Sequence, residues 1–312
     1  ADSVIKYHIP NTWFIKKTEA VTLPKWYGWG KFNSEYKVKL HVPEGIFNIQ
    51  IDPSGRLADI TPLNNSLKLP YLIEFDSQLR SFPDRQNYVI KLKPDVLWNS
   101  YDGLKIGFNW KSSFFNIRKK VDAEFWMNST FFQSDYGENI WINKNDDFSY
   151  DLKYEDILPN YAEKFKVKLR IALTGGVHKF QTGLHKTSHN LKHKFGIYAK
   201  SLFRSNTNQL NYALYPDYWN IGSLNNSINT YYKRPYTLVK GKGTMHINFR
   251  VSAILSDYNY EYIKFENIYQ RRLKKFYLKT RVFGFLGFGN NWAPESMLFM
   301  AGGNPEKKKK KK

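Results

Sequence analysis

From about residue 88 onward, apolar and polar side chains alternate along the chain in repeated segments. The clearest alternation spans residues 104–110, where every even-numbered residue from Leu104 to Trp110 is apolar and every odd-numbered one is polar or small. Successive side chains of a strand point to opposite faces, so this segment would have one apolar and one polar face. The preceding Asp102-Gly103 pair is typical of a hairpin turn, because Gly adopts positive φ without strain.

The same two-residue period returns in later segments of the chain. We count about ten to twelve such strands of roughly ten residues each, a length that suits a tilted crossing of a bilayer. The pattern therefore predicts an all-β fold whose main part is an antiparallel transmembrane β-barrel, preceded by a small β-sandwich. The segments that carry the period most clearly are 121–127, 165–171, 195–199, 245–253, 260–265 and 276–288.

Two segments interrupt the alternation. Residues 134–160 are polar and acidic, and residues 205–237 are rich in Asn, Tyr and Pro. We interpret both as long loops. Short turns that alternate with long polar loops are expected of an outer-membrane barrel.

The first 85 residues have a different pattern, interrupted by prolines. Val38, Leu40 and Val42 alternate with polar residues, and a second apolar segment runs from residue 46 to residue 51. The turn at residues 52–55 has Pro and Gly where a reversal needs them. Short strands between such turns predict a small β-sandwich over residues 1–85, with a partly helical connector at 68–86.

Tryptophan residues gather near the predicted strand ends. Amphipathic aromatic rings favour the membrane–water interface, so tryptophans at strand ends are typical of the aromatic girdle of a barrel. The girdle candidates are Trp98, Trp110, Trp126, Trp141, Trp219 and Trp292.

Basic residues recur on the polar faces of the predicted strands. Lys166, Lys168 and Arg170 occupy alternate positions of one strand, and Arg250 lies in a later one. A large soluble β-sandwich also has amphipathic strands and aromatic residues. Basic side chains along whole strands favour a wet, basic lumen instead, so these four are the predicted lumen-facing residues.

Composition narrows the range of functions. The chain has 312 residues and no cysteine, which excludes disulfides and thiolate metal sites. The net charge is +21, of which Lys307 to Lys312 contribute six, leaving 21 − 6 = +15. We expect residues 304–312 to be a non-native tail. No run of eighteen apolar residues occurs, so no transmembrane helix is predicted.

No catalytic, cofactor or metal motif is complete. His185, His189 and His193 are spaced as on one helix face, but lysines surround them, so we interpret the segment as a basic loop facing anionic lipid. The run 143–148 resembles a calcium loop that lacks its Gly and bidentate Glu. The glycines at 284–289 lack the strand-to-helix context of a dinucleotide site. The sequence predicts no cofactor and no metal.

Several stretches resemble a known family. Residues 51–60, 63–65 and 93–107 resemble the C-terminal part of Bacteroidetes envelope proteins that carry an M1-type (gluzincin) aminopeptidase domain upstream and a β-barrel region downstream. Residues 278–303 are similar to the final strands of surface-antigen (outer-membrane insertase) barrels. The His-Glu-x-x-His zinc motif of gluzincins is absent. The resemblance therefore implies a non-catalytic C-terminal portion of such a protein.

Together these observations predict a sandwich-like envelope domain over 1–85, in the periplasm or at the cell surface, and a complete or partial outer-membrane barrel over 86–303. The predicted function is a membrane anchor or scaffold whose partners are outer-membrane lipid, lipopolysaccharide and other envelope proteins. Nucleic acid is not an expected partner, because the basic residues are spread over many strands. The alternatives are an insertase, a soluble all-β module that binds glycan or nucleic acid, and a zinc aminopeptidase whose active domain lies outside this chain.

Overall fold

The chain divides into two compact units, residues 1–49 and residues 50–312, which are described here one at a time. The predicted boundary at residue 85 stays a prediction. The computed structural model describes residues 4–10, 17–27, 35–43, 45–57, 59, 61–76, 83–99, 103–116, 118–129, 148–158, 165–188, 193–205, 219–238, 241–273 and 275–298.

The first unit contains little regular structure in its described residues. Strands β1 (Tyr7–His8) and β2 (Val21–Thr22) pair in parallel. The strands predicted at 38–42 and 46–51 are wrong, because these residues form no strand apart from an isolated bridge between Gln50 and Ser66. An alternating segment needs a facing layer to cover its apolar side, and here that side stays exposed: Phe47 is 77% accessible.

The turn at residues 52–57, which opens the second unit, confirms one prediction. The Asp52 carboxylate accepts hydrogen bonds from the backbone N–H of Leu57 (2.6 Å) and the hydroxyl of Ser54 (2.9 Å). The Leu57 N–H holds the pKa of Asp52 below its ordinary value. Asp59 instead accepts a bond from the backbone N–H of Thr61, so the two carboxylates serve local turns. A short 3-10 helix, η1 (Pro62–Asn64), follows.

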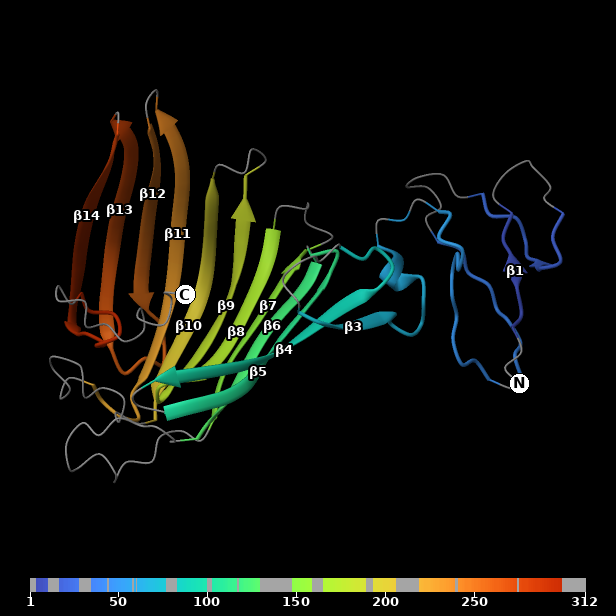
Figure 1. The fold of residues 1–312 in the computed structure, drawn as a ribbon, viewed down its shortest axis with the longest axis horizontal. Coiled ribbons are helices and arrows are strands. Elements are labelled where there is room, and N and C mark those ends of the chain that lie inside the picture. The colour runs from blue at the N-terminus through green and yellow to red at the C-terminus, as the bar shows by residue number, and fades with distance from the viewer. Residues whose placement is uncertain are drawn as a thin grey trace. The chain divides into compact units, whose positions relative to one another are not determined.

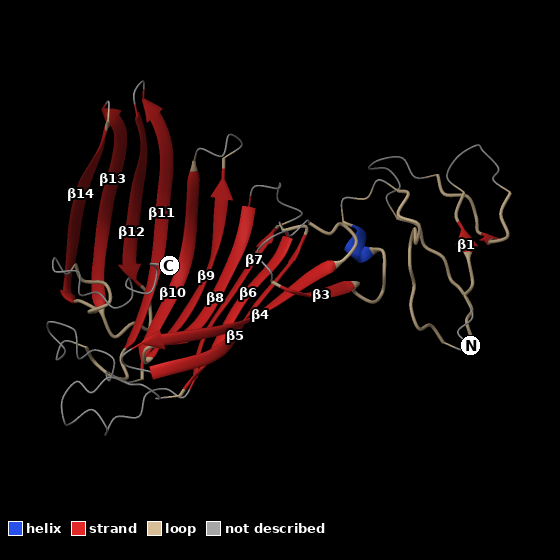
Figure 2. Cartoon of the chain, viewed as in Figure 1, coloured by secondary structure: helices blue, strands red, loops and turns tan. Residues whose placement is uncertain are grey.

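In the described residues after η1, the second unit forms one twisted, curved sheet of twelve strands, in which strand order follows chain order (Figures 1 and 2). Neighbouring strands are antiparallel, except that β3 pairs in parallel with β4. The all-β fold and the predicted number of strands are thereby confirmed. The strands are β3 (Tyr71–Phe75), β4 (Tyr88–Asn99), β5 (Gly103–Phe114), β6 (Arg118–Asn128), β7 (Phe148–Ile157), β8 (Phe165–Thr174), β9 (Val177–Thr187), β10 (Lys194–Arg204), β11 (Leu224–Leu238), β12 (Gly241–Ser252), β13 (Asn259–Leu273) and β14 (Phe276–Asn291).

The sheet is open in this structure. Strands β3 and β14 are its two edges, so the closed barrel predicted from the sequence is not seen. Two prolines lie inside strands, where the missing N–H would normally break the ladder. Pro94 lies beyond Leu92, where β4 stops pairing with β3, and Pro235 lies beyond Lys233, where β11 stops pairing with β10. In the described part of the sheet, each proline therefore lies where one side of its strand is paired and the other is not.

Two loop predictions and the helical connector were wrong in part. Strand β7 occupies residues 148–157 of the predicted loop 134–160, and β11 occupies residues 224–237 of the predicted loop 205–237. The connector contains strand β3, and the described part of it has no helix. Both missed long strands are rich in polar residues because one of their faces bonds to polar neighbours across the sheet. Among the girdle candidates, Trp141 lies outside the described residues.

Candidate functional site

The strand register gives the sheet two chemically different faces. One cross-strand row on β5 to β8 is Asn109, Glu124, Asp151 and Ala172. The adjacent row, which points to the other side, is Trp110, Ala123, Leu152 and Ile171. We name these sides the polar face and the apolar face. The alternation predicted for residues 104–110 is confirmed.

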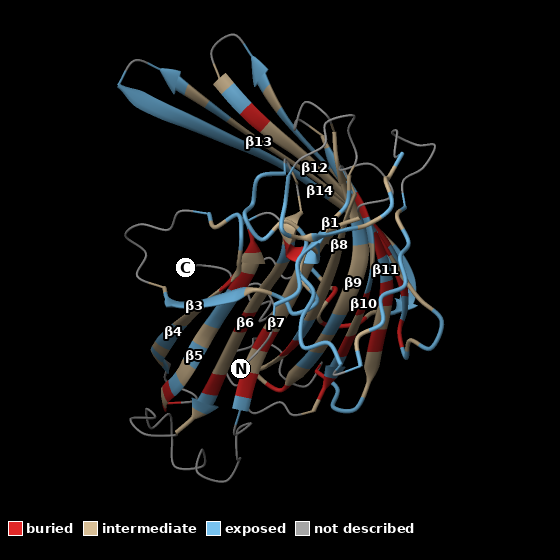
Figure 3. Ribbon diagram, turned by 90° about the vertical axis from the view of Figure 1, so that its right-hand side faces the viewer, coloured by how far each residue is buried: buried red, intermediate tan, exposed pale blue. Residues whose placement is uncertain are grey.

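The apolar face is the more exposed one. Figure 3 shows buried, intermediate and exposed positions interspersed along the strands of the sheet. Burial normally follows the opposite rule, with apolar side chains inside and charges outside. On the polar face, Lys105, Lys200 and Arg250 are only 5–8% exposed. Large apolar side chains on the other face are 37–50% exposed; they include Ile106, Phe108, Met127, Ile171, Phe180, Leu184, Ile197, Phe249 and Ile263.

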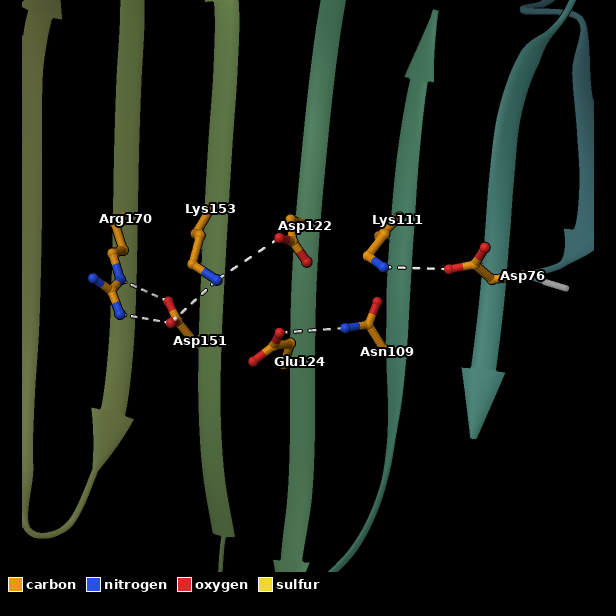
Figure 4. Close-up of polar contacts among 8 residues, drawn as sticks. All are labelled: Asp76, Asn109, Lys111, Asp122, Glu124, Asp151, Lys153 and Arg170. Atoms are coloured by element: carbon orange, nitrogen blue, oxygen red, sulfur yellow. Dashed lines mark hydrogen bonds and ion pairs between the residues drawn. The ribbon is translucent and has the colours of Figure 1, made fainter. Parts of the chain in front are cut away.

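A ladder of polar contacts crosses the polar face from the end of β3 to β8 (Figure 4). Arg170 on β8 donates two hydrogen bonds to Asp151 on β7, at 2.8 and 2.6 Å. Lys153 lies 3.3 Å from Asp151 and 3.8 Å from Asp122 on β6. Near the sheet edge, Lys111 pairs with Asp76 at 3.2 Å. We name these ion pairs, with the Asn109–Glu124 bond beside them, the ladder.

The predicted lumen-facing residues of β8 take part in the same kind of pairing. The Glu155 carboxylate on β7 lies 2.6 Å from Lys166 and 2.9 Å from Lys168. Lys166, Lys168 and Arg170 therefore share one face and each has an acidic partner on β7. These partners were missed in the sequence, because β7 was interpreted as part of a loop.

Arg250, the fourth predicted residue, belongs to a separate buried cluster. Its guanidinium donates to Asn229 on β11 and to Ser296, the latter at 3.1 Å. The Ser296 hydroxyl donates to the Tyr260 hydroxyl (2.7 Å), which donates to Asn225 (2.7 Å). We name these five residues the buried cluster. It covers β11 to β13 and includes one residue from the segment that follows β14, so it could not be read from local sequence.

Glycines on the polar face let partners meet across an intervening strand. Gly107 lies between Asp95 and Trp126, and the Trp126 indole N–H donates to Asp95 at 3.3 Å. A Cβ at Gly107 would lie 2.7 Å from Cδ1 of that indole. Gly196 lies in the same way between His185 and Tyr231, whose ring nitrogen Nδ1 and hydroxyl are 2.8 Å apart.

The tryptophan candidates separate into two groups. Trp98 and Trp110 are exposed on the apolar face. Trp126 is buried on the polar face, Trp219 is buried beside the Arg204 guanidinium, and Trp292 stacks on Tyr260. The five described girdle candidates thus do not form a single exposed ring, and Trp98 and Trp110 alone among them have the exposure that a girdle needs.

The described histidines of the predicted basic loop do not converge. His185 bonds to Tyr231 on the polar face, and His193 bonds to Tyr232 at 2.7 Å. Within the described residues, no group of three or more His, Asp or Glu side chains could hold a metal ion. In the same residues, we find no helix whose length and hydropathy would let it cross a membrane.

Comparison with known proteins adds no relative. No protein-family model matches the chain, and no curated protein is similar to it in sequence. The resemblance to the C-terminal part of gluzincin-like envelope proteins therefore stays a prediction. The chemistry of the two faces therefore has to be considered by itself: one face carries paired charges, and the other carries exposed apolar side chains.

Proposed function

We propose that residues 70–298 form the wall of an outer-membrane β-barrel that anchors or scaffolds other envelope components. The observation that supports this most is the reversed burial of the two faces, with charged side chains covered and apolar side chains exposed. In water such an apolar face is unfavourable, because each exposed Å² costs about 25 cal/mol of lost burial. In a bilayer the same face contacts lipid chains.

The strand dimensions support the same proposal. Strands β4 to β14 have 10 to 16 residues, enough to cross the hydrocarbon core at a tilt. Apolar-out and polar-in alternation with period two is the sequence signature of such barrels. The ladder and the buried cluster would then line the interior, where water and mutual pairing satisfy them.

The open edges set a condition on this proposal. Lipid cannot hydrogen-bond to an exposed strand edge, so a membrane sheet must close. The eleven strands from β4 to β14 follow one another antiparallel, so β4 and β14 run in the same direction, and β3, which is parallel to β4, makes both edges of the sheet run the same way. One added strand running the opposite way would pair antiparallel with both. A strand from a partner chain would meet this condition.

The sequence resemblance also supports the anchoring role. The sequence resemblance implies an upstream peptidase in a longer protein, and a barrel would hold such a domain at the cell envelope.

The proposal is tested by refolding the full chain from urea into phospholipid vesicles. We expect the protein to float with the vesicles, to resist extraction by carbonate, and to migrate differently on a gel with and without heating. The double variant Ile197→Arg with Phe249→Arg places charge on the apolar face and should abolish flotation, because each Arg near the bilayer centre costs about 2–4 kcal/mol.

The matched control places the same charges on the other face. Gln181→Arg with Asn248→Arg changes polar-face positions of β9 and β12, and we expect it to float like the unchanged protein. A chain that stays monomeric in buffer without lipid or detergent, with equal mobility heated and unheated, would refute the barrel. That result would favour the soluble all-β module.

A further inference from the structure

One cation lies within a run of apolar residues on the apolar face, near one end of strands β8 to β12. At this level the cross-strand row runs Phe165, Lys186, Phe195, Tyr232 and Ile247, from β8 to β12. The next row inward is Val167, Leu184, Ile197, Thr230 and Phe249, which contains no charge. Lys186 is thus the only charged side chain in these ten positions.

Two aromatic rings hold the Lys186 ammonium at this position. Its Nζ lies 4.6 Å from the ring centroid of Phe165 and 5.8 Å from that of Phe195, one on each neighbouring strand. Cation–π contact of this kind stabilises an ammonium at a partly apolar site. The described residues place no carboxylate within ion-pair distance of Lys186, whereas Lys166 and Lys168 on the polar face both have one.

An open apolar groove of about 430 Å³ lies directly beside this cation. Its walls come from β8 to β12, and it continues from Lys186 into the uncharged row. Tyr232 borders it, with its hydroxyl held 2.7 Å from the ring of His193. Arg234 lies two residues beyond Tyr232 and is exposed on the same face. The groove is lined by Phe165, Leu184, Lys186, Phe195, Ile197 and Phe249, among others.

We infer that this groove binds one phosphate-bearing anionic lipid, with the acyl chain in the groove and the headgroup phosphate on Lys186. The inference rests on the proposed function and names the partner of its apolar face. Charge complementarity selects the ligand: an apolar groove that ends at an ammonium matches a molecule with a long apolar chain and an anionic head. Arg234 is placed to contact the same headgroup from β11, since Lys and Arg side chains are the usual partners of phosphate.

The test compares two variants that remove one charge from the same end of the sheet. Lys186→Gln removes the proposed phosphate ligand, and Lys194→Gln removes an exposed cation of the polar face, next in sequence to Phe195. Both proteins are refolded in vesicles of phosphatidylcholine that contain a minor fraction of phosphatidylglycerol. The anionic lipid retained by each protein after extraction is counted by native mass spectrometry.

We expect Lys186→Gln to lower the retained phosphatidylglycerol about fivefold, because one basic group near an anionic surface contributes about 1 kcal/mol. Lys194→Gln should leave the retained amount within about twofold of the unchanged protein. Lys186→Arg, which keeps the charge, should preserve it. Inorganic phosphate at millimolar concentration should not displace the lipid; displacement would assign the site to a free anion instead. Equal retention by Lys186→Gln and the unchanged protein, with flotation and gel mobility intact, would overturn the site alone. Failure of all proteins to float would overturn the proposed function and this inference together.

Discussion

The two halves of the polar face satisfy their charges in different ways. From β3 to β8 the ladder uses carboxylates and cations in nearly equal number, and most of them keep some contact with solvent. From β11 to β13 the buried cluster uses neutral hydroxyl and amide groups around one guanidinium, and Ser296 from the C-terminal segment closes it. The first half is therefore held by hydrated charge pairs, and the second by a closed hydrogen-bond network.

This difference predicts which of the two sets of contacts contributes more to the free energy of unfolding. Partly exposed ion pairs contribute little, because water competes for both partners and screens them. Buried networks have larger consequences, since removing one member leaves the others without a partner and without water. We expect substitutions in the buried cluster to destabilise the sheet more than charge removal in the ladder.

The largest effect is expected at Arg250. Arg250→Met removes the hydrogen bonds to Asn229 and Ser296 and leaves both acceptors buried. The free energy of unfolding should fall by about 2–3 kcal/mol, the usual cost for lost hydrogen bonds to a charged group. Urea titration of the protein in detergent micelles measures this. A fall below about 0.5 kcal/mol would show that the cluster is not a stabilising network.

A steric change in the ladder half should come next. Gly107→Val places a side chain against the Trp126 indole and the backbone carbonyl of Phe125, and breaks the Trp126–Asp95 bond. Overpacking of this kind costs about 1–3 kcal/mol. Urea titration should show that loss, and Trp fluorescence should show a more hydrated indole. Gly45→Val is the control. No atom lies within 4 Å of a Cβ at Gly45, so this change adds no crowding, although it does add the strain of a side chain at positive φ.

Ser296→Ala tests the contact that closes the buried cluster. It removes the hydroxyl that accepts from Arg250 and donates to Tyr260, but leaves the strands unchanged. The unfolding free energy should fall by about 1 kcal/mol. Hydrogen exchange should rise selectively in β12 and β13. A uniform rise over all strands would instead indicate that Ser296 supports the whole sheet.

The smallest effect is expected from charge removal in the ladder. Arg170→Gln loses the paired bonds to Asp151, yet the Arg170 side chain is partly exposed and Lys153 remains 3.3 Å from the same buried carboxylate. The loss should stay below about 1 kcal/mol and shrink further in 1 M salt. The Arg250→Met loss should be unchanged by salt. If Arg170→Gln instead lowers the free energy of unfolding as much as Arg250→Met does, and by the same amount in low and high salt, the two halves do not differ.

The sequence predicted the faces of the strands better than their partners. Around Leu104 to Trp110 the period is strict, because one face is uniformly apolar, and the structure follows it. Strand β11 was missed since Asn225, Ser227 and Asn229, which favour turns in isolation, occupy its polar face and are buried there. These residues are stabilised by contacts with residues far along the chain, and a local sequence pattern cannot predict such contacts.

The opposite error occurred near the N-terminus. Residues 38–42 have the same alternation as β5, yet they form no strand. Amphipathic alternation is a necessary condition for a half-buried strand, but a neighbouring strand must also be present to take its hydrogen bonds. In β5 that neighbour is supplied on both sides; at Val38 to Val42 the described residues supply none.

One measurement addresses the central claim that the apolar face contacts lipid. Because the chain contains no cysteine, Ile197→Cys and Tyr198→Cys place single thiols on opposite faces of adjacent positions in β10. Each is labelled with a small fluorophore and the protein is refolded into vesicles. We predict that a quencher attached to lipid chains quenches the label at 197 and not at 198, while aqueous iodide does the reverse. Quenching of both labels by iodide, with no effect of the lipid quencher at 197, would contradict the account.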